Sequence, residues 1–253
     1  MALTRNKMKT YLHIDDTTRN TDFLQKQYTN DLHLLHTSFD EVSLYTMPKD
    51  VILVKENCQS SDFLRLYFKY FNPDKNFCSH ILLMENDYRK FILTDAALNI
   101  NPSLKDLVKI TQNAIKFWTK LNKNIIMESQ PIHVNFLSNS GHLELGNQTA
   151  CNCQLLKDYF EQTECQNLYT TWQLDTCLYD KSRVKKAGEL SYPDIIVVPN
   201  LDTGNAIYKA LLYQYRCCGF IFGGATPAIL NSRSDLDKNS ESIKILNKVM
   251  SNL

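Results

Sequence analysis

The feature of this sequence that most restricts its fold is a repeated succession of a short apolar run, a polar segment and a helix-like stretch. Such alternation is typical of α/β folds with a mostly parallel sheet. In these sheets ligands lie beyond the carboxyl ends of the strands, where the polar segments gather. The sequence therefore predicts a three-layer α/β/α fold with a site among its turns. The apolar runs that we expect to be strands are residues 90–93, 132–137, 195–199 and 219–222.

The helices expected after these runs are marked by caps and by apolar spacing. Ser103 and Asp106 have the spacing of a capping box. From Leu104 to Leu121 apolar residues recur at helical intervals, which predicts an amphipathic helix packed on the sheet. Further helices are expected at residues 151–162, 206–215 and about 240–250. In the first of these, we expect Leu155, Leu156, Tyr159 and Phe160 to face inward.

The part of the chain before residue 75 has a less regular pattern. We predict two lobes, an abbreviated N-terminal lobe at residues 1–75 and an α/β core at residues 76–253. The elements expected in the first lobe are helices at residues 21–36 and 60–71 and strands at residues 41–45 and 51–54.

Composition excludes several classes of protein. The 28 Lys and Arg residues balance 27 Asp and Glu residues, so there is no surplus charge for a nucleic-acid backbone. The N-terminus has no signal-peptide core, and no apolar stretch reaches the roughly 18 residues of a membrane span. We therefore expect a cytoplasmic protein with neither nucleic acid nor membrane as partner.

Metal binding is a weaker alternative for the cysteines and histidines. The eight Cys residues lack the repeated CxxC spacing of zinc sites, so reduced thiols are expected. Cys151 and Cys153, or His33 and His36, have spacings that allow ligation, but such pairs are more often structural. We expect no metal.

Glycine usage limits where a ligand site can lie. A protein of this length carries about 7% Gly, or roughly 18 residues, on average. This chain has 7, and none precedes Gly141. Because ligand loops often need close backbone approach, we expect the site within residues 137–235.

Three polar segments in that region combine features that bind anions. Residues 138–141, 202–205 and 231–235 each follow an expected strand and precede an expected helix, whose N-terminus favours negative charge. The last contains Arg233, whose planar fork suits phosphate or carboxylate. Lys209 follows the second segment by one turn, and Asp175 is a further acid that can either join the site or cap a helix. Helix capping without a ligand remains the alternative for each segment.

Motifs for other chemistries are absent from the sequence. There is no GxxxxGK[ST] or GxGxxG run, which disfavours P-loop and dinucleotide-binding sites. There is also no GxSxG nucleophile elbow.

Taken together, these segments resemble the phosphate acetyltransferase and phosphate butyryltransferase family, with the butyryl branch the nearer. PDIIVVPNLDTGNAIYKALLY is similar to its strand and GNxxYK helix, and GFIFGGATPAILNSRSD to its last strand and SR loop. TDAALNINP, FLSNSG, LDTC and VKENCQSSDFLR resemble further family segments in the same order. The resemblance covers roughly residues 50–253, with a shortened N-terminal lobe.

The resemblance implies transfer of an acyl group between CoA and inorganic phosphate, in a fold shared with isopropylmalate dehydrogenases. It implies acyl-CoA and phosphate as substrates, no cofactor, and a homodimer or higher homo-oligomer. By position, Ser232 and Arg233 would hold the phosphoryl group, and Asp235 would accept or orient the CoA thiol proton. The residues that would line or brace the same pocket are Ser138, Ser140, Gly141, Gly204, Asn205 and Lys209.

Departures from the family pattern, two of them at Glu56 and Asn239, leave alternatives open. Glu56 stands where the family has Gly after Lys, which places a negative charge where close backbone approach is usual. Asn239 stands where the acetyl branch has an acid. A degenerate member that binds CoA or phosphate ligands, or serves as a subunit-interaction module, is the main alternative. A dehydrogenase-like enzyme is a lesser one, and it would require a cluster of metal-binding acids.

Overall fold

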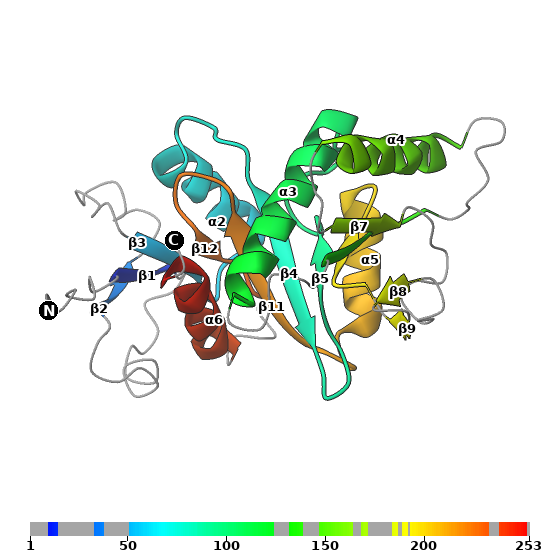
Figure 1. Cartoon of the computed structure of the whole chain (residues 1–253). Coiled ribbons are helices and arrows are strands. Elements are labelled where there is room, and N and C mark those ends of the chain that lie inside the picture. The colour runs from blue at the N-terminus through cyan, green and yellow to red at the C-terminus, as the bar shows by residue number, and fades with distance from the viewer. Residues whose placement is uncertain are drawn as a thin grey trace, which may run out of the picture. The chain divides into compact units, whose positions relative to one another are not determined.

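The chain is described by a computed structural model, shown in Figure 1. It forms two compact units. Unit 1 comprises Met1–Phe77 and Cys218–Leu246, and unit 2 comprises Cys78–Cys217 and Asn247–Leu253. The sequence-based division into lobes at residue 75 stays a prediction. The residues that the structure describes are 10–14, 33–37, 51–123, 132–138, 147–163, 168–171, 184–186, 189–191, 193–232 and 238–251.

Unit 1 is built on five strands in the order β2-β1-β3-β12-β11. The first four run parallel, and β11 is antiparallel to β12. The strands are β1 (Thr10–Ile14), β2 (His33–Thr37), β3 (Val51–Lys55), β11 (Arg216–Phe222) and β12 (Ala228–Ile229). The helices are α2 (Ser60–Leu66), the π-helix η2 (Tyr67–Phe71) and the part of α6 (Asn239–Ser251) up to Leu246. Every residue of β3 is buried, as its apolar sequence VILVK leads one to expect of a central strand.

The predicted elements of the first 75 residues have mixed outcomes. The strand at residues 51–54 and the helical segment at residues 60–71 are confirmed. The helix expected at residues 21–36 is wrong at its end, because His33–Thr37 is strand β2, paired residue by residue with β1. Sheet pairing here overrides a helical spacing of apolar residues. Residues 21–32 and the strand expected at residues 41–45 lie outside the described residues.

Unit 2 contains five strands in the order β4-β5-β10-β6-β7. Only β4 is antiparallel to its neighbour. The strands are β4 (Ser79–Glu85), β5 (Lys90–Thr94), β6 (Ile132–Phe136), β7 (Leu168–Thr171) and β10 (Ile195–Val197). A separate antiparallel pair is formed by β8 (Val184–Lys186) and β9 (Glu189–Ser191). The mostly parallel α/β fold predicted from the sequence is thus confirmed.

The hairpin of β4 and β5 was not expected from the sequence. Asn86 closes its turn, since its side-chain oxygen accepts the backbone N–H of Tyr88 at 3.0 Å and of Arg89 at 2.8 Å. Such an Asx turn lets two apolar runs of similar composition pair directly.

Helices cover both faces of the unit 2 sheet. Ile196 belongs to an apolar cluster that packs against Ile207 and Tyr208 of α5 (Leu201–Leu211). The next residue, Val197, points to the opposite face, toward α3 (Leu104–Leu121) and α4 (Gln148–Gln162). None of the helices within the described ranges is both long and apolar enough to cross a membrane.

The helix predictions of unit 2 are confirmed in position and partly corrected in detail. The Ser103 and Asp106 capping box opens α3. In α4, Leu156 and Phe160 are buried as expected, whereas Leu155 is 50% and Tyr159 39% exposed, so these two do not face the core. Positions 156 and 160 are one turn apart and define a single buried stripe of the helix. Positions 155 and 159 lie outside this stripe.

Candidate functional site

The carboxyl edge of unit 2 brings three loop starts together. Strands β5, β10 and β6 are parallel neighbours that end at Thr94, Val197 and Phe136. Val198 N–H donates to the Thr94 carbonyl, and Leu137 N–H donates to the Val197 carbonyl, both at 2.8 Å. The loops after these strands therefore start side by side, at the edge where ligands of α/β sheets bind.

The first of these loops is organised by Asp95, which is 2% exposed. Its Oδ1 accepts the backbone N–H of Ala97 at 3.0 Å and of Leu98 at 2.8 Å. Its Oδ2 accepts the backbone N–H of His80 at 2.9 Å and the side chain of Asn99 at 2.6 Å. One carboxylate thus receives four hydrogen bonds, which fixes the TDAALN segment as a rigid platform.

The second loop leads directly into α5, and here a sequence prediction is wrong. Residues 202–205 were expected to form a turn, but they lie inside α5, which begins at Leu201. Asn200 caps the helix, because its side-chain oxygen accepts the backbone N–H of Thr203 at 2.9 Å. The Asn side chain so placed starts the helix five residues earlier than the apolar pattern indicates.

Gly204 lies where α5 meets the Asp95 loop. A Cβ atom at this position would stand 2.9 Å from Ala96 Cα and 2.9 Å from the Asp95 carbonyl oxygen, closer than real side chains pack. Gly204 therefore allows the helix to contact the platform. Asn205 is half-buried and Lys209 is exposed on the same helix. Their roles toward substrate stay predictions.

Ser138 stands at this same edge, two residues after β6, and is 2% exposed. The structure therefore brings Ser138 and the start of the Gly204 helix to one edge of one unit. Ser140, Gly141 and Asp175 lie outside the described residues.

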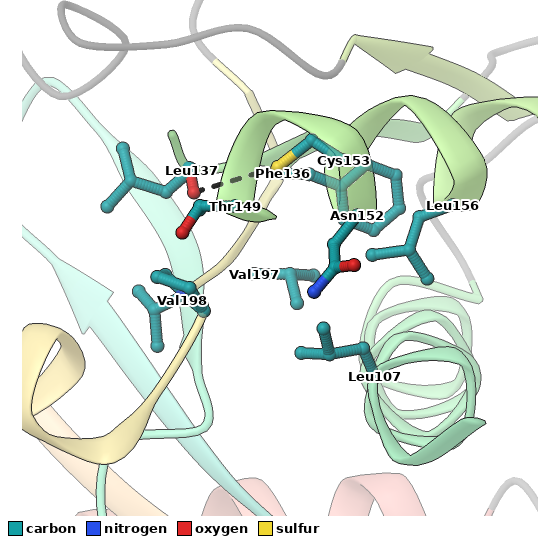
Figure 2. Close-up of a pocket in the computed structure, with 10 residues that line it drawn as sticks. Leu107, Phe136, Leu137, Thr149, Asn152, Cys153, Leu156, Val197 and Val198 are labelled. Carbon is teal, nitrogen blue, oxygen red and sulfur yellow. Dashed lines mark hydrogen bonds between the residues drawn. The ribbon is translucent and has the colours of Figure 1, made fainter. Parts of the chain in front are cut away.

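A small pocket adjoins Leu137, the residue before Ser138 (Figure 2). Leu137, Val198 and the side chains of α3 and α4 line it, including Leu107, Asn152 and Cys153. Its enclosed volume of about 20 Å³ is far below the roughly 300–1,000 Å³ of typical small-molecule sites.

Cys153 borders this pocket as a neutral thiol. Burial raises its pKa to about 12, since the thiolate would lose its hydration. Its Sγ instead hydrogen-bonds with the Leu137 carbonyl at 3.7 Å. Because the thiolate is the reactive form, Cys153 is not a nucleophile at neutral pH.

The carboxyl edge of unit 1 has a different chemistry. Strands β1, β3 and β12 are parallel neighbours, and Lys55 and Glu56 stand where β3 ends. Lys55 is fully buried, and its Nζ donates to the backbone carbonyls of Glu56 and Asn231, each at 3.3 Å. The buried Lys55 side chain therefore contacts the residue that directly precedes Ser232.

Glu56 is buried at this edge. Its side chain is 4% exposed, its Oε1 hydrogen-bonds with His13 Nδ1, and Asn239 Nδ2 donates to the same oxygen at 3.1 Å. Partners from β1 and α6 thus surround the carboxylate that stands where the family has glycine. Two of the departures from the family pattern, Glu56 and Asn239, contact each other.

Asn231 joins this edge to the segment that carries Ser232. Its Nδ2 donates to Asn239 Oδ1 at 2.8 Å and to Ser242 Oγ at 2.9 Å, and its Oδ1 accepts Gly219 N–H at 2.7 Å. Ser232 is half-buried, whereas Arg233 and Asp235 lie outside the described residues.

Sequence reasoning missed several residues that build these edges, namely His13, Asp95, Asn231 and Ser242. A signal existed for Asp95, in the TDAALN segment, and for Asn231, beside the SR pair. His13 and Ser242 carried none. Within the described residues, no group of three or more His, Cys, Asp or Glu side chains is placed to hold a metal ion.

Comparison with protein families gives a match over most of the chain. The model of a family described as phosphate acetyl/butaryl transferase matches residues 58–247.

Curated relatives carry names of the same kind. The phosphate acetyltransferase of Mycoplasma capricolum is 31% identical over 188 residues, which cover 72% of this chain and 55% of that protein. The phosphate butyryltransferase of Clostridium acetobutylicum is 27% identical over 164 residues, which cover 62% of this chain and 53% of that protein. The chain thus spans about half the length of the curated relatives it matches.

A solved structure shares the fold over nearly the whole chain. It is a branched-chain phosphotransacylase from Enterococcus faecalis, with a TM-score of 0.73 and 21% identity. The match covers 96% of this chain and all of that one.

Proposed function

The chain belongs to the phosphate acetyl/butyryl transferase family, as its motifs predicted, and on this premise we propose that it moves a short acyl group between CoA and inorganic phosphate. In the direction of acyl phosphate formation, a phosphate oxygen attacks the thioester carbon. The new C–O bond forms as the C–S bond breaks, and the CoA sulfur leaves with the electron pair and takes up a proton. CoA enters as a substrate, and no further cofactor is required.

The observation that carries this proposal is the anchored start of the SR segment in unit 1. Asn231 is held by three side-chain hydrogen bonds, and the buried Lys55 ammonium contacts its carbonyl. Ser232 and Arg233 directly follow Asn231 in the chain. The residues with the hydroxyl and the guanidinium therefore begin next to a fixed residue at the carboxyl edge of parallel strands. We assign these two residues to the phosphoryl group, whose charge the guanidinium neutralises in a bidentate contact.

The remaining predicted residues are assigned around the acyl and thiol groups. Asp235, two residues after Arg233, orients the CoA thiol. Ser138, with Ser140 and Gly141, contributes hydroxyls and backbone at the edge of unit 2. The further members proposed for this region are Gly204, which braces the platform, and Asn205, Lys209 and Asp175. The active assembly is proposed to be a homodimer.

The reaction is tested by phosphate-dependent release of free thiol from acetyl-, butyryl- and longer acyl-CoA by the purified chain. We expect release with short acyl groups only in the presence of phosphate. Failure of every acyl-CoA, with phosphate and CoA still bound in calorimetry, would instead favour a degenerate binding module.

Arg233→Lys tests the assigned phosphate contact. Lys keeps the charge but loses the paired geometry. Because a hydrogen bond to a charged group contributes roughly 1.5–3 kcal/mol, apparent phosphate affinity should fall by about ten- to a hundredfold. Arg65→Lys is the matched control, since Arg65 is an exposed partner of Asp62 on α2 and should leave the phosphate dependence unchanged. An unchanged phosphate dependence in Arg233→Lys excludes Arg233 as the ligand.

A further inference from the structure

The carboxylate of Glu56 and the amide of Asn239 form a buried pair behind the segment assigned to phosphate. We propose that this pair positions Ser232 and Arg233, with Glu56 and Asn239 as positioning residues that act through Asn231. The inference rests on the proposed function, because it concerns the same phosphate site.

The pair lies in an unbroken chain of hydrogen bonds that ends at the SR segment. Asn239 Nδ2 donates to Glu56 Oε1 at 3.1 Å and to the Lys55 carbonyl at 3.3 Å. Asn239 Oδ1 in turn accepts from Asn231 Nδ2 at 2.8 Å. Both polar atoms of the Asn239 amide are therefore engaged, which fixes its orientation and leaves one direction for the Asn231 side chain.

Burial makes this geometry stringent. Asn239 is fully buried, and Glu56 and Asn231 are each 4% exposed. A polar group displaced at such a position has no water to replace its partner. The Asn231 side chain must therefore follow a small rotation of the Asn239 side chain to keep the hydrogen bond between them. Residue 231 has no freedom to absorb it, because Gly219 N–H and Ser242 Oγ hold it from the other sides.

The charges of the edge support the same role. His13 Nδ1 hydrogen-bonds with Glu56 Oε1 from β1, and the Lys55 ammonium contacts the carbonyls of residues 56 and 231. A carboxylate and a buried Lys side chain thus lie beside the start of the SR segment. Exchange of the carboxylate for a neutral group removes the negative charge with which His13 and the Asn239 amide hydrogen-bond.

A reciprocal exchange of the two side chains tests the coupling. Asn239→Asp places a second carboxylate against Glu56 and removes the donor to it, so apparent phosphate affinity should fall about ten- to a hundredfold. Glu56→Gln removes the charge but keeps the shape, and we expect a loss of about tenfold. In the double variant the amide of residue 56 again donates to a carboxylate at 239, so most of the Asn239→Asp loss should be recovered.

The measurements are the phosphate KM and kcat of thiol release and, independently of turnover, phosphate binding by calorimetry and the melting temperature without ligand. A positioning role raises the phosphate KM and the dissociation constant more than it lowers kcat. Glu161→Gln is the matched control, because Glu161 pairs with Lys157 on the exposed face of α4. It should change none of these quantities.

Three outcomes would overturn the inference. Variants with a lower melting temperature but an unchanged phosphate KM would show that the pair only stabilises the fold. A double variant no better than Asn239→Asp would show that the two residues are not coupled. If Asn239→Asp does not fold, the phosphate KM of Glu56→Gln tests the inference, and an unchanged KM would overturn it. A native chain that neither binds phosphate nor releases thiol would overturn the proposed function itself, and the inference with it.

Discussion

The two carboxyl edges are both formed by neighbouring parallel strands, but they are held by different means. In unit 2 a single carboxylate, Asp95, collects three backbone donors and one side-chain donor, and α5 packs on this platform at Gly204. In unit 1 the edge is a network of side chains that contains His13, Lys55 and Glu56.

The difference teaches how each edge depends on the rest of the chain. Asp95 bonds to residues no more than 15 positions away. Glu56 bonds to Asn239, 183 positions away, and to His13, 43 positions away. The edge of unit 2 is therefore a local structure, whereas the edge of unit 1 exists only when distant segments have met. We expect substitutions in the first to act on stability, and those in the second to act also on the phosphate site.

Asp95→Ala is the strongest test of this contrast. The change leaves four donors without their buried acceptor, at about 1–3 kcal/mol for each group that finds no water. We expect the free energy of unfolding to fall by about 3–5 kcal/mol, measured by urea denaturation. Asp95→Asn, which keeps one acceptor oxygen, should lose less. A variant that keeps its stability but loses phosphate affinity would contradict the assignment of Asp95 as a structural platform.

Gly204→Ala should cause the next largest loss of stability. Alanine improves helix propensity by about 1 kcal/mol, but its Cβ would meet Ala96 and the Asp95 carbonyl at 2.9 Å. Overpacking against backbone costs roughly 1–3 kcal/mol, so a net loss is expected. Ala210→Gly, an exposed position of the same helix, measures the propensity alone. If Gly204→Ala raised the melting temperature, the close contact would not exist.

Cys153 provides a smaller, pH-dependent test of the apolar surroundings in unit 2. Its pKa is raised to about 12 in the folded chain, so the unfolded chain loses the thiol proton first as pH rises above 9. The stability contributed by the neutral thiol is present below pH 9 and is lost toward pH 12. Between pH 8 and pH 10 the native chain should lose about 1 kcal/mol more than Cys153→Ala. Cys151→Ala, at a half-buried position of α4, is the control, and equal losses in all three proteins would contradict the raised pKa.

The elements that were predictable from the sequence are those whose signals are local. Helix α3 follows from a capping box and an apolar stripe within 18 residues, and β10 from a short β-branched run. Strand β2 was not predictable, because its conformation depends on pairing with β1 and its own spacing favours a helix.

The candidate site divides in the same way. The segments of Ser138, Gly204 and Ser232 were proposed from residue types next to expected strand ends, although residues 202–205 lie inside a helix and do not form a turn. The contact of Glu56 with Asn239 was not, since each residue looked like an isolated departure from the family pattern and nothing in a linear sequence joins positions 183 apart. Only the return of β12 to the side of β3 brings them together.

That return also sets an order of events during synthesis. Lys55 leaves the ribosome 176 residues before Asn231, which at about 5–20 residues per second is an interval of roughly 10 to 35 seconds. The whole of Cys78–Cys217, most of unit 2, is made in that time. Its strands can pair while β3 still lacks its neighbour β12. Of the two edges, the one assigned to phosphate is thus the later to close on a nascent chain. A chain arrested before residue 228 carries Ser138 and Gly204 but lacks Asn231, which anchors the segment assigned to phosphate.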